Sequence, residues 1–141
     1  AAPPLDQPKG GRYELLGNWP WNSDELDKGR TIHHMPPSRW LHLIQGEQSP
    51  IRVSLFVSNE RLTMGTFRLR PGTVSDPEEH PGDEIAFVTE GAAHVYLPES
   101  RQVFDMETLD ATYIPEGTPH RYINESSEPA TVVFAVAPQY R

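Results

Sequence analysis

The chain has 141 residues, of which 36% are hydrophobic and 23% are charged. This length suits one domain, and no apolar stretch approaches the roughly 20 residues that span a membrane. The formal net charge of -8 argues against binding to nucleic acid or to an anionic membrane. Zero cysteines rule out disulfides and thiolate metal sites. No signal peptide is recognisable, so we expect a cytoplasmic protein. We expect its partner to be a small molecule.

Residues 1–40 show no regular pattern and are expected to form an irregular N-terminal arm. Prolines interrupt this region, and its only helix candidate is a short one at 23–28. Two placements of the arm remain open, along its own barrel or along a neighbouring subunit. Trp19, Trp21 and Trp40 can cover a pocket or anchor a subunit interface. Because this apolar surface exceeds what one small barrel covers, we predict a homodimer.

The remaining residues, 41–141, are expected to form an all-β domain. Short runs rich in Val, Ile, Phe, Tyr and Thr alternate here with turn signals, a pattern typical of strands. The 15 Pro and 10 Gly residues leave few windows long enough for helices. Many short strands with regular breaks indicate a sandwich or a barrel. The predicted strands cover 40–44, 51–58, 62–70, 84–89, 92–97, 102–106, 112–114, 120–124 and 131–137.

Two stretches, 72–91 and 109–124, carry polar residues and glycines at fixed spacing. They resemble the two motifs of the cupin superfamily, with eight positions matched: Gly72, His80, Glu84, Gly91, Pro115, Gly117, His120 and Asn124. Glu78 stands where the first motif has its first histidine, and Leu109 stands where the second has its leading glycine. The resemblance implies a double-stranded β-helix, or jelly-roll barrel, that holds one divalent metal ion.

The ligands that this resemblance implies are Glu78, His80, Glu84 and His120. Residues two apart in a strand point the same way, so Glu78 and His80 can both face the barrel interior. Two imidazoles and one or two carboxylates suit a divalent ion. The alternative is a metal-free barrel in which these side chains bond one another.

Glu78 leaves two interpretations open. If Glu78 binds the metal, two glutamates cancel the charge of the ion and favour hard ions such as Mn(II) or Fe(II). If it stands off the metal, His80, Glu84 and His120 form the two-histidine, one-carboxylate set of non-haem iron enzymes. Glu78 is then available as a general base. Fe(II) or Mn(II) is favoured, with Zn, Ni or Cu as alternatives.

Tyr122 lies two residues after His120, so both side chains are expected to face the cavity. Tyr122 could also donate or accept a proton there. Ala86 and Val88 share parity with Glu84, and Phe67 joins them as an expected pocket residue. His33, His34 and His42 are expected to be structural. Arg68 and Arg70 are two apart on one strand; a solvated face is favoured over binding of an anionic substrate.

Three functions compete. The favoured one is a metal-dependent enzyme of the Fe(II) dioxygenase type acting on a small organic molecule, with Glu78 and Tyr122 as catalytic residues. The second is a redox-neutral isomerase, lyase or cyclase, in which the metal polarises a carbonyl group. The third is a non-catalytic cupin that binds metal or a small molecule, since a fold alone does not give a function.

Overall fold

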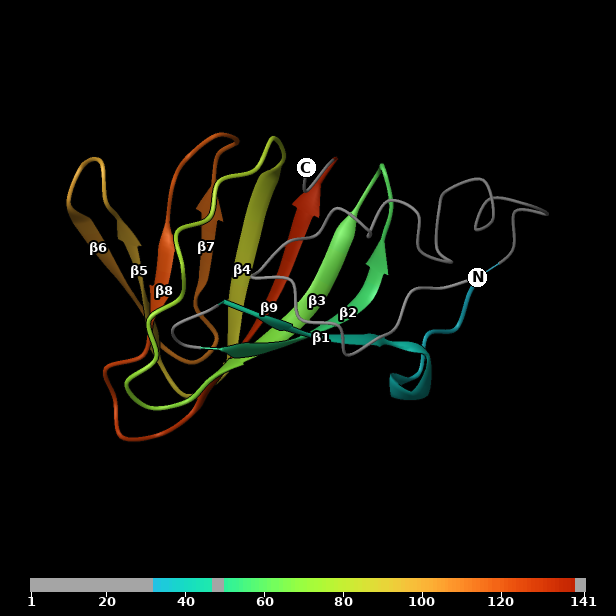
Figure 1. The fold of residues 1–141 in the computed structure, drawn as a ribbon, viewed down its shortest axis with the longest axis horizontal. Coiled ribbons are helices and arrows are strands. Elements are labelled where there is room, and N and C mark those ends of the chain that lie inside the picture. The colour runs from blue at the N-terminus through green and yellow to red at the C-terminus, as the bar shows by residue number, and fades with distance from the viewer. Residues whose placement is uncertain (1–31, 47–49, 139–141) are drawn as a thin grey trace.

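The computed structural model describes residues 32–46 and 50–138, in which the regular secondary structure is almost entirely β. A single 3-10 turn, η2 (Pro37–Arg39), precedes the first strand. The strands, shown in Figure 1, are β1 (Leu41–Gln45), β2 (Ile51–Ser58), β3 (Thr63–Leu69), β4 (Asp83–Glu90), β5 (Ala93–Leu97), β6 (Gln102–Met106), β7 (Ala111–Ile114), β8 (Arg121–Ile123) and β9 (Ala130–Ala137).

The strands form two antiparallel sheets that pack as a jelly roll. One sheet has the order β1-β2-β3-β9-β4-β7, and the other has the order β6-β5-β8. In Figure 1, β6, β5 and β8 gather at one end of the molecule, while β1, β2 and β3 curve around the other end. Neighbours such as β3 and β9 are far apart in sequence, as the jelly-roll crossovers require. The predicted all-β jelly-roll fold is confirmed.

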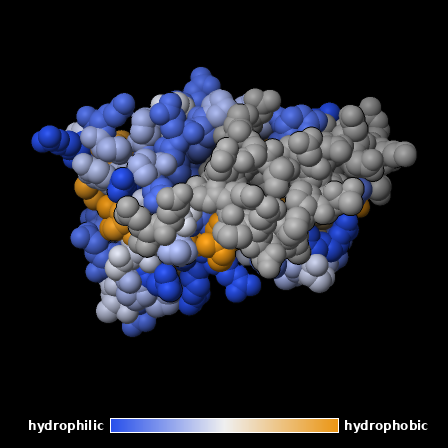
Figure 2. Space-filling view, in the orientation of Figure 1, coloured by the Kyte–Doolittle hydropathy of each residue, from blue (hydrophilic) through white to orange (hydrophobic). Residues whose placement is uncertain are grey.

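Alternating side chains place the core between the sheets. Along β9 every second residue is buried, from Ala130 through Val132 and Phe134 to Val136. Leu55, Leu69, Val95 and Met106 from other strands are also fully buried and join the same cluster. On the face shown in Figure 2, the described residues are mostly hydrophilic, with small hydrophobic areas between them. The described residues therefore have one core.

The observed strands agree closely with the predicted ones. The prediction is matched for β2 and β6, and the other strands differ by one residue at one or both ends. Trp40 packs against Phe56 with a ring-centroid distance of 4.5 Å, and its indole donates to the Met35 carbonyl at 2.7 Å.

The helix predicted at 23–28 and most of the predicted arm lie outside the described residues. Within 32–46 and 50–138, no helix is long and apolar enough to cross a membrane.

Candidate metal centre

Three buried side chains from separate segments converge between the sheets. Glu84 lies near the start of β4, His80 precedes that strand, and His120 immediately precedes β8. One ligand atom from each residue can be chosen so that all three atoms lie within 4.8 Å of one another. His120 is fully buried, and His80 and Glu84 are each 3% exposed. This His80–Glu84–His120 group can hold a metal ion.

An extended segment running alongside β8 brings the group together. Ser75 donates its amide to the Tyr122 carbonyl at 2.8 Å, and the amide of Gly117 donates to the His80 carbonyl at 2.9 Å. Between them, Glu78 and His120 form an isolated antiparallel bridge. Gly117 adopts a φ of 69°, a conformation that glycine reaches without strain. The two motif stretches are therefore held side by side by backbone hydrogen bonds.

Backbone carbonyls orient both imidazoles. His80 Nδ1 lies 3.0 Å from the Gly82 carbonyl, and His120 Nδ1 lies 2.8 Å from the Thr118 carbonyl. Because a carbonyl oxygen only accepts, each Nδ1 must carry the proton. The neutral form of each ring therefore presents an unprotonated Nε2 toward Glu84. Fixing a ligand histidine through its other nitrogen is the usual outer-sphere arrangement of protein metal sites.

The Nε2 atom of His120 supplies the test of whether a metal fits. It is buried and has no hydrogen-bond partner among the described residues, although Glu84 Oε1 lies 3.4 Å away. Burying a polar nitrogen without a partner is unfavourable. A divalent cation placed among the three donors would satisfy this nitrogen and balance the carboxylate. The residues present fit a divalent metal ion.

Without metal, electrostatics tie the same side chains together. Burial alone raises the pKa of Glu84, but the neighbouring imidazoles of His120 and His80, together with the Tyr122 hydroxyl, lower it to about 2. Burial lowers the pKa of His80 and of His120, and the Glu84 carboxylate outweighs it, so both values are raised. His80 Nε2 lies 2.7 Å from Glu84 Oε1. Without metal, the group is thus a cluster of ion pairs. Coordination bonds to a bound cation would take the place of these contacts.

Tyr122 supports the centre from β8. Its hydroxyl donates to Glu84 Oε2, and the residue is 1% exposed. Burial, followed by the charge and hydrogen bond of Glu84, raises the pKa of Tyr122 well above its ordinary value. The phenol therefore stays neutral and acts as a hydrogen-bond donor, which orients the carboxylate toward the two imidazoles.

A pocket opens beside this group. Glu78 lies on its wall, half-buried, and Gln45 Nε2 donates to Glu78 Oε1 at 3.4 Å. Glu78 does not belong to the three-residue group found among the described residues. The lining residues are Gln45, Gly46, Ile51, Val53, Phe67, Ser75, Asp76, Glu78, Glu84, Tyr122 and Phe134.

Two of the four predicted pocket residues line the pocket, and two do not. Phe67 and Tyr122 line it, with a ring-centroid distance of 4.9 Å between them. Ala86 and Val88 are fully buried in the hydrophobic core and are not among the residues that line this pocket. They share a face with Glu84, but each two-residue step along a strand advances about 6.6 Å. Those steps carry β4 past the pocket and into the packed interior.

The sequence analysis missed three polar residues of the pocket: Gln45, Ser75 and Asp76. Asp76 shares alternation parity with Glu78 and His80, a signal that could have found it. Gln45 gave no such signal, because it reaches the pocket only through the position of β1. Ser75 is already engaged, since its hydroxyl accepts the Tyr122 amide at 2.8 Å.

Other singled-out side chains have structural contacts. His42 Nδ1 lies 2.8 Å from Ser54 Oγ, as expected for a structural histidine. Arg68 pairs with Glu90 at 2.8 Å on the exposed surface, so the favoured solvated face is the one observed. Asn124 is fully buried and donates to the Leu69 and Glu128 carbonyls. This motif residue therefore braces the β8–β9 connection.

Comparison with solved structures gives the same fold at low sequence identity. The polyketide cyclase RemF from Streptomyces resistomycificus is 15% identical, with a TM-score of 0.61 over 76% of this chain and 80% of that one. An RmlC-like cupin from Shewanella frigidimarina is 14% identical, with a TM-score of 0.61 over 77% and 92%. The EutQ protein of Clostridium difficile is 15% identical, with a TM-score of 0.55 over 64% and 70%. Such identities show the fold alone.

No curated protein matches the sequence. The family model described as the cupin domain matches residues 65–136, which is half of the chain. That range contains His80, Glu84 and His120, the three residues that the fold brings together. On this match, the chain belongs to the cupin family.

Proposed function

We propose that the protein is a metal-dependent enzyme of the Fe(II) dioxygenase type that acts on a small organic molecule. The observation that carries this proposal is the composition of the buried group. Two imidazoles and one carboxylate converge, while Glu78 lies outside the group on the pocket wall. A two-histidine, one-carboxylate set leaves coordination positions open and is the pattern of non-haem Fe(II) oxygenases.

A bound Fe(II) would supply open coordination positions and the electrons that activate dioxygen. Glu78 would act as general base and accept a proton from the substrate. Tyr122, which stays protonated, would hold Glu84 in its ligating orientation. Ile51, Val53, Phe67 and Phe134 would bind the apolar part of the substrate and exclude water from it. Mn(II) suits the same donors, and Zn, Ni or Cu are the alternative ions.

A redox-neutral isomerase, lyase or cyclase is the second candidate. It is favoured by Glu78, because a carboxylate beside a cation can move a proton next to a polarised carbonyl group without dioxygen. The likeness to a polyketide cyclase extends to the fold only. A non-catalytic cupin that binds a small molecule would need the same pocket but not Glu78 as a base.

The first experiment measures the metal in the protein as purified by elemental analysis. The Fe(II)-loaded protein is then assayed in an oxygen electrode with a panel of small oxygenated aromatic and aliphatic compounds. Oxygen uptake that depends on both Fe(II) and substrate supports a dioxygenase. Substrate conversion by the Mn(II)-loaded protein without oxygen would instead support the redox-neutral reaction. Metal-independent turnover would contradict both.

We also propose that the chain forms a homodimer. Ile85 and Tyr113 are cross-strand partners on β4 and β7, and they are 42% and 60% exposed. These two neighbouring side chains would extend the apolar surface that a partner covers. Light scattering at micromolar concentration should give twice the mass of one chain. A monomer mass at that concentration would contradict the proposal.

A further inference from the structure

A second cavity lies between the two sheets, away from the metal group. Its volume is about 220 Å³, and its wall includes Val95, Leu97, Phe104 and Ile114. These residues belong to β5 and β6 of one sheet and to β7 of the other. Both β6 and β7 lie at an end of their sheets. The cavity, which we call the edge cavity, therefore lies between two sheet edges.

Strand register shows that this wall belongs to the interior of the jelly roll. Val95 is paired with Phe104 on β6, and Ile114 is paired with Glu84 on β4. Directly opposed residues of an antiparallel pair project to the same face. Val95 is fully buried and Ile114 is 2% exposed, so this face is the inner one. Phe104 also points inward, yet it is 44% exposed, because the space beside it is not filled by the described residues.

The edge cavity is separate from the pocket beside the metal group. Glu84 and Tyr122 line that pocket. The edge cavity is lined instead by their cross-strand neighbours, Ile114 on β7 and Val95 on β5. It therefore begins one strand further out in each sheet. Because the described walls share no residue, the edge cavity is a site of its own.

The wall of the edge cavity is apolar and uncharged. Thr112, Tyr113 and Thr118 contribute the only hydroxyl groups of its described wall, and the other described residues there are aliphatic, aromatic or proline. A charged group that enters such a site loses its hydration and gains no partner of opposite charge. The wall therefore favours an uncharged ligand.

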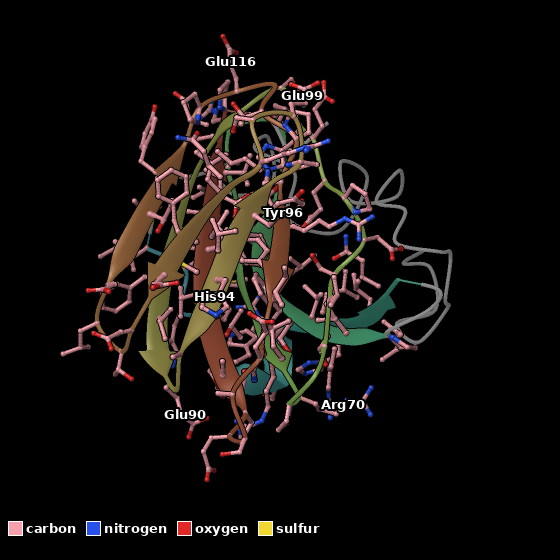
Figure 3. The ribbon with its side chains drawn as sticks, turned by 90° about the vertical axis from the view of Figure 1, so that its left-hand side faces the viewer. Arg70, Glu90, His94, Tyr96, Glu99 and Glu116 are labelled. Atoms are coloured by element: carbon pink, nitrogen blue, oxygen red, sulfur yellow. The ribbon has the colours of Figure 1, made fainter. Side chains whose placement is uncertain are left out.

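Acidic residues lie just beyond this wall. Glu99 follows the wall residue Leu97 by two positions, and Glu116 directly follows Pro115. Both glutamates are exposed, and Figure 3 labels them at the same end of the molecule. Like charges repel, so an anion that approaches from this end is disfavoured further.

The volume sets the size of the ligand. Protein interiors are close-packed, and voids larger than a water molecule are few. A cavity of about 150 Å³ lined by Leu, Ile and Phe stays dry and binds benzene. The edge cavity has similar walls and is larger, at about 220 Å³. It can admit one six-membered ring with a short substituent.

We propose that the edge cavity binds a compact, uncharged molecule made of one apolar six-membered ring with a short substituent. This site lies outside the His80–Glu84–His120 group and does not depend on the reaction proposed above. Val95 and Ile114 would contact the ring from the two sheets, and Phe104 would cover it at the sheet edge.

The test compares two probes of the same size, 4-fluorotoluene and 4-fluorobenzoate, by fluorine NMR titration of the protein without added metal. We expect saturable binding of 4-fluorotoluene with a Kd of about 1 mM or tighter. The anion should bind at least about tenfold more weakly. Equal affinity for the two probes, or no saturable binding of 4-fluorotoluene, would overturn the proposal.

Two substitutions that fill the edge cavity locate the binding. Thr112 is half-buried and points inward as the partner of Ala86, so Thr112→Leu should weaken 4-fluorotoluene binding at least about fivefold. Ala111→Leu is the matched control, because the neighbouring exposed residue points to the opposite face of β7. Leu97→Phe fills the same space from β5, so the test does not depend on one variant folding.

Unchanged binding in both filling variants would overturn the assignment to this cavity, as would an equal loss in Ala111→Leu. The titration is repeated at low and high protein concentration, since a second copy of the chain could cover the same sheet edges. An affinity that falls as the protein concentration rises would identify a second copy as the occupant and overturn the proposal.

Discussion

Glu78 and His120 face each other across an antiparallel bridge, in which the amide of each donates to the carbonyl of the other at 2.9 Å. Residues directly opposite each other in an antiparallel pair project their side chains to the same face. This bridge explains how Glu78 comes to lie on the pocket wall beside a buried histidine.

Glu78→Gln tests the role of this carboxylate. The substitution keeps the size of the side chain but removes its charge and basicity. If Glu78 is a general base, the variant should hold metal nearly normally and lose about two to four orders of magnitude in rate. Elemental analysis and turnover measured on the same preparation check this. A parallel loss of metal would identify Glu78 as a ligand instead.

His80→Ala and His120→Ala should each release metal. Either change deletes a neutral donor and leaves Glu84 buried with fewer partners. Because binding to the folded state adds to stability, the melting temperature should no longer rise when metal is added. His42→Ala is the control, since His42 contacts Ser54 and lies outside the group. Normal metal content in both variants would show that the site lies elsewhere.

Tyr122→Phe should destabilise the protein while leaving both histidine ligands in place. Phenylalanine keeps the ring but removes the hydroxyl that donates to buried Glu84. Loss of a hydrogen bond to a buried charge costs about 1.5 to 3 kcal/mol of unfolding free energy. Urea denaturation of the metal-free protein measures this cost. Tyr96→Phe is the control, since Tyr96 on β5 is only half-buried and loss of its hydroxyl should cost less; equal losses would contradict the assigned role.

Leu109→Gly should stabilise the fold. Leu109 adopts a φ of 77°, which side chains rarely tolerate, and it is 70% exposed, so little packing is lost. Relief of this backbone strain should outweigh the added entropy of the unfolded chain and give a gain of about 0.5 to 1 kcal/mol. The urea midpoint measures the effect.

Gly91→Ala should act in the opposite direction. Gly91 has a φ of 76°, and an added Cβ would lie 2.3 Å from the Pro129 carbonyl oxygen. A lower urea midpoint for Leu109→Gly would contradict the strain argument at Leu109. An unchanged urea midpoint for Gly91→Ala would contradict the strain argument at Gly91.

Local pattern was enough to predict the strands and the candidate ligands. Alternation of side chains places Val132, Phe134 and Val136 on one face of β9, independently of how the other strands pack. The resemblance in motif spacing likewise pointed to His80, Glu84 and His120 before their positions were known. Both signals belong to short stretches of chain, so the sequence alone determines them.

Only the tertiary structure decided which interior side chains reach the pocket. Parity placed Ala86 and Val88 with Glu84, but parity says nothing about depth along a strand. Gln45 contacts Glu78, 33 residues away in sequence, because the end of β1 lies at the pocket. His120 Nε2 is left available for a metal because the Thr118 carbonyl accepts the hydrogen bond of His120 Nδ1. Each of these outcomes depends on the register and packing of elements distant in sequence, which no local pattern encodes.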